Sequence, residues 1–222
     1  GTIFFLPLLS QLYYYAMKCL SFFILLFIGE LSVSAQHMFS RQFPFFNQLS
    51  SNEIFSIHQD REGYFWIGTT NGLARYDGYQ LNTFRTDYKN QNLLTDNGIT
   101  AINDNDLYVW IGTWKGLNLY NKQTCRITPF PDARLLDKVV DAITVDKDGN
   151  VWVSAGGMIY RCDSTAHIIK EYEVGNIQEG YAISNIYVDQ QKQLWAVGSR
   201  GIFRYEPETD SFFRYPPLGN GH

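Results

Sequence analysis

The chain has 222 residues, of which 45% are hydrophobic, 16% aromatic and 18% charged, and its formal net charge is −4. The high aromatic and low charged content excludes an intrinsically disordered protein and favours a packed fold rich in β-structure. The mild acidity, with no cluster of Lys and Arg, argues against a nucleic-acid partner. Three cysteines are too few for a disulfide framework, and no pair has the spacing of metal ligands, so we expect no metal and no cofactor.

Residues 17–35 have the three-part pattern of a secretory signal peptide. The positive charge after Met17 precedes the apolar run 20–28, which is too short to span a bilayer, and small residues lead up to Ala35. The sequence therefore predicts an exported chain, with residues 1–16 as an artefact of upstream translation. An uncleaved N-terminal membrane anchor is the alternative.

Four copies of one motif make up the chain from residue 49 onward, and a tryptophan marks each copy. The tryptophans are 44, 42 and 43 residues apart, at Trp66, Trp110, Trp152 and Trp195. The predicted copies are bounded at 49–93, 94–134, 135–178 and 179–222. In three copies a tyrosine lies ten residues after the tryptophan, at Tyr76, Tyr120 and Tyr205. We interpret the third copy as two residues shorter, with Tyr160 in the place of that tyrosine.

Each copy contains four short runs of β-branched and aromatic residues, separated by turns of Asp, Asn and Gly. A repeat of about 40–45 residues with four strands is typical of one blade of a β-propeller. We therefore predict an all-β fold, a partial β-propeller of four blades from a ring of about seven. Residues 36–48 are predicted to be a lead-in strand that closes the ring by pairing with a blade beyond residue 222. The alternative is a complete ring of four blades.

The positions that recur between the copies are expected to specify the fold. The tryptophan lies on the second strand of each blade, where a large buried ring fills the gap between neighbouring blades. Glycines recur on the same strand and in the turn that follows it, where a side chain would be unfavourable. These structural positions are Trp66, Trp110, Trp152, Trp195, Gly68, Gly112, Gly72, Gly116 and Gly201.

The first copy resembles the two-component regulator propeller repeat, whose pattern contains Asp-x-x-Gly-x-x-Trp-Ile-Gly-Thr-x-x-Gly-Leu. The segment from Asp60 to Leu73 matches this pattern at every defined position. The second copy lacks the turn glycine, and the third lacks the Ile-Gly-Thr. Over residues 39–222 the resemblance implies a periplasmic sensor propeller, the N-terminal part of a hybrid two-component histidine kinase.

The resemblance also implies partners outside these residues. The whole protein would carry further blades, a transmembrane helix in the bacterial inner membrane and a histidine kinase, would form a homodimer, and would sense an oligosaccharide. Ligand binding would change the packing or dimerisation of the periplasmic part. No phospho-accepting His motif and no nucleotide-binding box occurs in the sequence, so this fragment is predicted not to be an enzyme.

The candidate binding residues lie in the turns between the second and third strands of the blades. In a propeller these turns share one face with the links between blades. Trp114 interrupts an otherwise polar turn, so we predict an exposed platform for a sugar ring, with Lys115 and Arg200 supplying hydrogen bonds or charge. Asn71 lies in the equivalent turn of the first copy. The alternative is that Trp114 packs on the loop of a neighbouring blade.

Two other functions stay open. A free-standing secreted propeller enzyme, a lyase or a glycosidase, would also have tryptophan-rich repeats, but no catalytic motif occurs and His58 is expected to be a packed or rim residue. A non-catalytic interaction scaffold is the second alternative. A disulfide between Cys125 and Cys162 is also left open, because an exported chain reaches an oxidising compartment.

Overall fold

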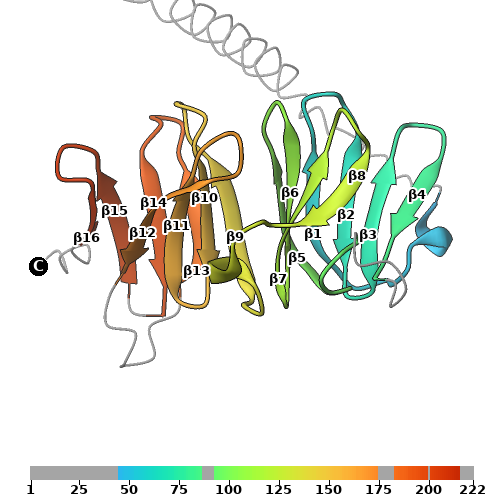
Figure 1. Ribbon diagram of the computed structural model, residues 1–222, viewed down its shortest axis with the longest axis horizontal. Coiled ribbons are helices and arrows are strands. Elements are labelled where there is room, and N and C mark those ends of the chain that lie inside the picture. The colour runs from blue at the N-terminus through green and yellow to red at the C-terminus, as the bar shows by residue number, and fades with distance from the viewer. Residues whose placement is uncertain (1–44, 87–92, 175–182, 200, 216–222) are drawn as a thin grey trace, which may run out of the picture. The chain divides into compact units, whose positions relative to one another are not determined.

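The computed structural model describes the chain in four ranges, which are 45–86, 93–174, 183–199 and 201–215 (Figure 1). The predicted signal peptide, most of the predicted lead-in strand and Arg200 lie outside these ranges. Within them, no helix has the length and apolar character needed to cross a membrane.

The described residues form four antiparallel sheets of four strands, and each sheet keeps the order of the chain (Figure 1). We call these sheets blades 1 to 4. Blade 1 contains β1 (Ile54–Gln59), β2 (Phe65–Thr69), β3 (Gly72–Tyr76) and β4 (Leu81–Phe84), and blade 2 contains β5 (Ile99–Asp104), β6 (Tyr108–Thr113), β7 (Gly116–Asn121) and β8 (Arg126–Pro129). Blade 3 contains β9 (Val140–Val145), β10 (Val151–Ala155), β11 (Met158–Cys162) and β12 (Ile168–Glu173), and blade 4 contains β13 (Ile183–Val188), β14 (Leu194–Gly198), β15 (Gly201–Glu206) and β16 (Ser211–Arg214). The predicted all-β fold with four-stranded blades is confirmed.

The hydrophobic cores lie between successive blades. Trp66 of blade 1 packs edge-on against Tyr120 of blade 2, and Trp152 of blade 3 packs in the same way against Tyr205 of blade 4, each with ring centroids 4.8 Å apart. Trp110 is equally buried, in the core between blades 2 and 3. Burial of one such side chain contributes roughly 2–3 kcal/mol, so each blade depends on its neighbours for its stability.

The recurring glycine on the second strand is required by the next blade. A Cβ atom on Gly68 would lie 2.6 Å from Cγ2 of Ile99, and one on Gly112 would lie 2.6 Å from Cγ1 of Val140. Blade 3 has Ser154 at this position, and its hydroxyl donates a hydrogen bond of 3.0 Å to the carbonyl oxygen of the residue that begins β13. In these three blades the position therefore contacts the first residue of the next innermost strand.

The interpretation of the third repeat as two residues shorter is wrong. Val151 pairs with Cys162 across the β10–β11 hairpin, as Phe65 pairs with Tyr76 in blade 1. The two hairpins therefore have the same length, and Cys162 takes the place of the recurring tyrosine instead of Tyr160. A small, weakly polar thiol suits this buried position in the core between blades 2 and 3.

The repeat with a shortened hairpin is the second one. Trp66 pairs with His58, eight positions earlier, whereas Trp110 pairs with Asn103, only seven positions earlier. One residue is therefore missing from the turn between β5 and β6. Because side chains alternate along a strand, a strand residue at a given distance before the tryptophan presents opposite faces in blades 1 and 2.

The end of the predicted lead-in strand is helical. Its last three residues form the short 3-10 helix η1 (Phe46–Gln48), because Phe45 has left the extended conformation, with φ −106° and ψ 15°. The ring of Phe45 packs on Tyr76 of blade 1, with centroids 5.3 Å apart. A second 3-10 helix, η2 (Ala133–Leu135), lies in the link between blades 2 and 3.

Both described cysteines are free thiols, Cys125 exposed and Cys162 buried, so the structure does not contain the disulfide that the sequence left open. Burial raises the pKa of the Cys162 thiol to about 12. This thiol therefore stays protonated at neutral pH and acts as a packing group.

Candidate functional site

Trp114 lies in the turn between β6 and β7, and 44% of the residue is exposed. Its ring covers Gly98, where a Cβ atom would approach the ring to 2.4 Å, and its backbone N–H donates to the Gly98 carbonyl at 3.1 Å. The ring of Phe55, from β1 of blade 1, meets it edge-on with centroids 6.2 Å apart. The indole is therefore held in place by backbone and by a second aromatic ring, while nearly half of it stays open to a ligand.

Lys115 is the candidate residue that belongs to the same support. Its ammonium group lies 3.8 Å from a carboxylate oxygen of Asp96, and 65% of its side chain is exposed. Asp96 also accepts a hydrogen bond of 2.8 Å from the backbone N–H of Gly98, the residue beneath the Trp114 ring. The charged group and the aromatic ring thus rest on one short segment before β5.

Asn71 holds its own blade together instead of joining Trp114. Its side-chain amide donates to the carbonyl oxygen of Ser50 at 3.3 Å, and its backbone carbonyl accepts a bond of 2.9 Å from Nε of Arg85. These contacts tie the segments on either side of blade 1, and no contact joins Asn71 to Trp114 in the described part of the chain. Arg200 lies outside the described residues, so its place at the site stays a prediction.

Phe55 is the residue of this site that sequence reasoning missed. The pairing of β1 with β2 shifts between Ile54 and Ser56, which leaves Phe55 in a β-bulge with 55% of the residue exposed. The innermost strand of every other blade has the same bulge, at Thr100, Asp141 and Ser184. The available signal was an aromatic residue in a register position where the other copies have small or charged ones.

Asp141 is the charged residue at this bulge position. Its side chain has no hydrogen bond or ion pair with another described residue, and it is exposed at the surface while its carboxyl group lies against the neighbouring strands. This desolvation raises the pKa of the Asp141 carboxyl to about 6. The group therefore titrates close to neutral pH, unlike an ordinary surface aspartate.

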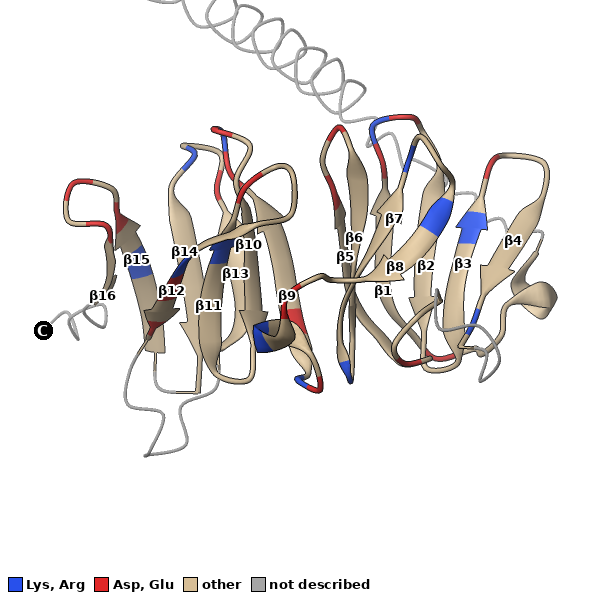
Figure 2. Ribbon diagram, in the orientation of Figure 1, with Lys and Arg blue, Asp and Glu red and all other residues tan. Residues whose placement is uncertain are grey.

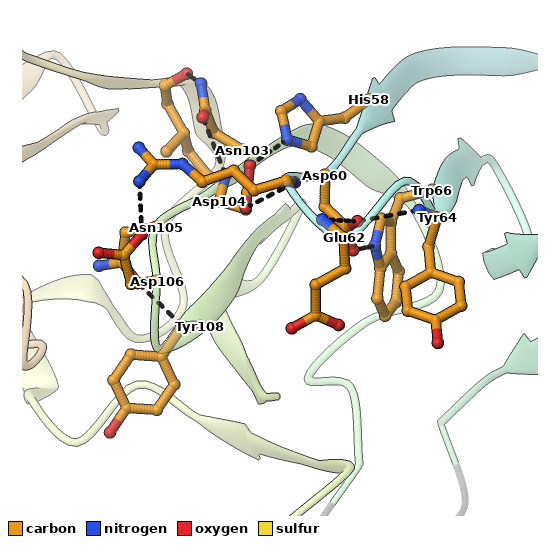
Figure 3. A network of polar contacts seen from close by, with 12 residues as sticks. His58, Asp60, Glu62, Tyr64, Trp66, Asn103, Asp104, Asn105, Asp106 and Tyr108 are labelled. Atoms are coloured by element: carbon orange, nitrogen blue, oxygen red, sulfur yellow. Dashed lines mark hydrogen bonds and ion pairs between the residues drawn. The ribbon is translucent and has the colours of Figure 1, made fainter. Parts of the chain in front are cut away.

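A buried ionic network joins blades 1 and 2 at the end of the blades that is opposite to Trp114 (Figure 3). One carboxylate oxygen of Asp104 accepts a bond of 2.7 Å from Nε2 of His58, and the other accepts one of 2.7 Å from Nζ of Lys122. The side chains of Asp104 and Lys122 are only 5% and 7% exposed. Burial raises the pKa of Asp104, but the hydrogen bonds from His58 and Lys122 outweigh it and lower the pKa to about 2. His58 therefore has a packing partner in blade 2.

The indole N–H of the recurring tryptophan has a turn aspartate as its acceptor in three of the four blades. The pairs are Trp66 with Asp60 at 2.7 Å, Trp152 with Asp146 at 2.8 Å, and Trp195 with Asp189 at 2.8 Å. In blade 2 the shorter turn places Asn105 at the corner, where its side-chain amide donates to the carbonyl oxygen of Ser164 at 3.1 Å. The buried indole N–H of Trp110 has no partner among the described residues. Sequence reasoning missed this exception because Asp104 keeps the same spacing from its tryptophan.

The two ends of the blades differ in chemistry. Figure 2 shows acidic residues, coloured red on the ribbon, in the turns at the top of the view, at the end of the blades where the turn aspartates bind tryptophan. They include Asp60, Glu62, Asp104, Asp106, Asp146, Asp148 and Asp189. The exposed aromatic pair of Trp114 and Phe55 lies at the other end, where the second and third strands are joined.

A sequence model of the family described as "Two component regulator propeller" matches residues 48–71. This segment contains β1, β2 and the turn between them, whose Asp60 accepts the indole N–H of Trp66. No curated protein sequence matches the chain.

Solved structures with this fold include extracellular domains of two-component systems and enzymes. The extracellular domain described as part of the hybrid two-component system BT4673 of B. thetaiotaomicron superposes with a TM-score of 0.61 and 22% identity, over 76% of this chain and 23% of that one. The corresponding domain of BT3049 from the same organism gives 0.54 and 21%, over 78% and 31%. Virginiamycin B lyase from Staphylococcus aureus gives 0.58 and 18%, over 76% and 57%.

At these identities the superpositions show the fold alone, and the chain spans less than a quarter of the BT4673 extracellular domain. The family match adds what the fold cannot, because it rests on the residues of the first hairpin. Residues 48–71, in the first of the four blades, therefore match the two-component regulator propeller repeat.

Proposed function

We propose that the chain is part of the extracytoplasmic sensor propeller of a two-component system and binds its ligand on the face that carries Trp114. The family match at residues 48–71 supports the sensor, and two structural relatives are extracellular domains of hybrid two-component systems. The likeness to a lyase is one of fold alone.

The observation that carries the ligand-binding part is the fixed, half-open indole of Trp114. An aromatic ring that is already held in place stacks on the apolar face of a sugar at little cost in conformational entropy. Phe55 extends this apolar surface, and the ammonium group of Lys115 supplies a hydrogen-bond donor beside it. An oligosaccharide is therefore the ligand class that fits this surface best.

We also expect the chain to be exported through its predicted signal peptide. Further blades that complete the ring, a membrane anchor and a histidine kinase are expected in the same protein, which is expected to form a homodimer. Ligand binding would then act on the packing or dimerisation of the periplasmic part. The sequence of the gene beyond residue 222 tests this assignment separately, since a stop codon after the last blade with no transmembrane helix would contradict it.

Calorimetry of the purified chain against neutral oligosaccharides of glucose, xylose, arabinose and mannose tests the binding face. At least one sugar is expected to bind, and Trp114→Ala is expected to weaken its binding at least about tenfold, which corresponds to about 1.4 kcal/mol. Tyr79→Ala is the matched control, because Tyr79 is an aromatic residue that is 88% exposed in the turn between β3 and β4, at the other end of blade 1. No heat with any sugar, or an equal loss in both variants, would contradict the proposal.

A further inference from the structure

A polar hollow of about 220 Å³ lies between blades 3 and 4, at the end of the blades that carries the acidic turns. The turns between β9 and β10 and between β13 and β14 supply its walls, and Trp152 and Tyr205 lie beneath them. Its volume is below the roughly 300–1,000 Å³ of pockets that hold drug-sized ligands, so a single small ring is the size that it admits.

The charged groups at the corresponding place between blades 1 and 2 are replaced in blades 3 and 4, and one of the replacements, Pro207, lines the hollow. Between blades 1 and 2, His58, Asp104 and Lys122 occupy the space with a buried ionic network. By strand register the equivalent residues of blades 3 and 4 are Thr144, Val188 and Pro207. These three side chains carry no charge, and where the ammonium group of Lys122 fills the first interface, Pro207 leaves the hollow open.

Two of the polar groups around the hollow are already used by the fold. The Asp146 carboxylate accepts the indole N–H of Trp152 and three N–H groups of its own turn. The side-chain amide of Gln193 donates to the backbone carbonyl of Tyr205 at 2.6 Å. Neither Asp146 nor the amide nitrogen of Gln193 is therefore available to hold a ligand.

The remaining polar side chains have no such use. Lys147, Asp148, Gln191 and Lys192 line the hollow, are exposed, and have no hydrogen bond or ion pair from their side chains to another described residue. With Asp146 the lining holds two ammonium groups and two carboxylates, but the Asp146 carboxylate is already occupied by N–H groups of the fold. The two unpartnered ammonium groups can bind an anionic group of a ligand, and Asp148 and Gln191 can bind its hydroxyl groups.

The backbone of Lys192 has a conformation that is unfavourable for a lysine. Its φ is +66°, and the equivalent residues of blades 1 and 3 are Gly63 at +93° and Gly149 at +84°. A lysine in this left-handed conformation is less stable than a glycine would be. The lysine therefore places an ammonium group at the hollow at some cost in backbone stability.

We propose that this hollow binds a sugar acid, a single hydroxylated ring that carries a carboxylate. Lys147 and Lys192 bind the carboxylate, while Asp148 and Gln191 bind ring hydroxyls. The site is independent of the surface at Trp114, because the two lie at opposite ends of the blades. It acts either as a second ligand site of a sensor or as a specificity site for one acidic residue of a longer glycan.

Calorimetry of the purified chain with D-glucuronate, D-glucose and acetate tests the ligand class. Glucuronate is expected to bind at least about tenfold more tightly than either of the others, because only it has both the carboxylate and the ring hydroxyls. Binding of glucose with equal affinity, or no binding of glucuronate, would overturn the proposal.

Lys192→Gly tests the location, because it separates binding from folding. Removal of the positive-φ lysine is expected to raise Tm by about 2–4 °C, while the affinity for glucuronate falls about tenfold. Lys147→Ala is expected to weaken glucuronate binding similarly. Glu62→Ala is the control, since Glu62 is the exposed residue of blade 1 equivalent to Asp148 and borders the filled cleft. Unchanged affinity in both lysine variants, or an equal loss in the Glu62 variant, would overturn the site.

Discussion

The interface between blades 1 and 2 and the interface between blades 2 and 3 have the same fold but are held by different chemistry. Between blades 1 and 2 the contacts are ionic and aromatic. Asp104 accepts from His58 and Lys122, and the guanidinium group of Arg75 donates to the hydroxyl of Tyr120 at 2.6 Å. The same guanidinium lies over the ring of Tyr120, so this interface combines charge with aromatic surface.

Between blades 2 and 3 neutral side chains donate to backbone carbonyl groups. The amide of Asn103 bonds to the carbonyl oxygen of Ile143, and the amide of Asn105 bonds to that of Ser164, both at 3.1 Å. Trp110 fills the core here without a partner for its indole N–H among the described residues.

The cation and its aromatic acceptor are both replaced at the interface between blades 2 and 3. Leu119 has the position that Arg75 has between blades 1 and 2, and Cys162 has that of Tyr120. A partly buried guanidinium without its partner would be costly, so the cation and its acceptor are replaced together. The comparison teaches that the repeated positions specify where blades meet, while the residues around them decide how strongly.

The largest effect expected from this comparison is the loss of the ionic network. Asp104→Ala leaves the 7% exposed Lys122 without its acceptor, so the free energy of unfolding should fall by about 3–5 kcal/mol in urea denaturation. Asn103→Ala, at the neutral interface, should lower it by only about 1 kcal/mol. Equal losses in the two variants would show that the ionic interface is not the more sensitive one.

Acid should weaken the first interface selectively. The folded pKa of Asp104, about 2, is below the ordinary value of 3.8, so its contribution of about 2 kcal/mol is complete above roughly pH 5 and is lost as pH falls toward 2. The free energy of unfolding of the parent chain should therefore drop more steeply from pH 5 to pH 3 than that of Asp104→Ala. Parallel curves would contradict this.

The tryptophans give a matched pair of substitutions. Trp66→Phe removes the donor to Asp60 and leaves a buried carboxylate oxygen unsatisfied, whereas Trp110→Phe removes an N–H that has no described partner. Both variants lose packing, but we expect Trp66→Phe to be more destabilising by about 1–2 kcal/mol. A larger loss for Trp110→Phe would show that its indole N–H has a partner.

Removal of the Asp141 charge, unlike the substitutions above, should increase the free energy of unfolding. Because the folded pKa of Asp141 is raised to about 6, this group makes the fold less stable as pH rises from about 4 through 6. Asp141→Asn should therefore increase the free energy of unfolding at pH 8, by on the order of 1 kcal/mol or less after solvent screening, and change little at pH 4. The thermal midpoints of both proteins at the two pH values check the sign.

The smallest effect should come from the exposed ion pair beside the buried network. Nη1 of Arg61 lies 2.5 Å from Oδ1 of Asp106, but the two side chains are 57% and 83% exposed. Asp106→Ala should change the free energy of unfolding by less than about 0.5 kcal/mol. A change close to that of Asp104→Ala would mean that exposure is a poor guide to strength at this interface.

Much of the fold could be predicted from the sequence because the pattern that encodes it is short and repeated. The period of the tryptophans fixes the number of blades, and the turn residues fix the hairpins. What failed was register. Tyr160 looked like the recurring tyrosine because Cys162 is not aromatic, and the deletion before Tyr108 was hidden because Asp104 keeps the aspartate spacing.

Less of the candidate site could be predicted, because it depends on contacts between copies. The exposed turn position of Trp114 follows from its place in the repeat. Its support by Gly98 and Phe55 does not, because a bulge in β1 and a link between blades bring these residues together. The hollow near Lys192 depends on groups that are absent, and a single copy of the repeat cannot show that.

The missing residue in the turn between β5 and β6 also has a consequence for cooperativity. In repeat proteins, stability is approximately the sum of what each unit contributes by itself and what each junction contributes. The deletion takes from blade 2 the bond between a turn aspartate and its tryptophan, and it turns Asp104 toward blade 1. Blade 2 is therefore less stable by itself and more strongly coupled to blade 1, so blades 1 and 2 should unfold together as a single unit.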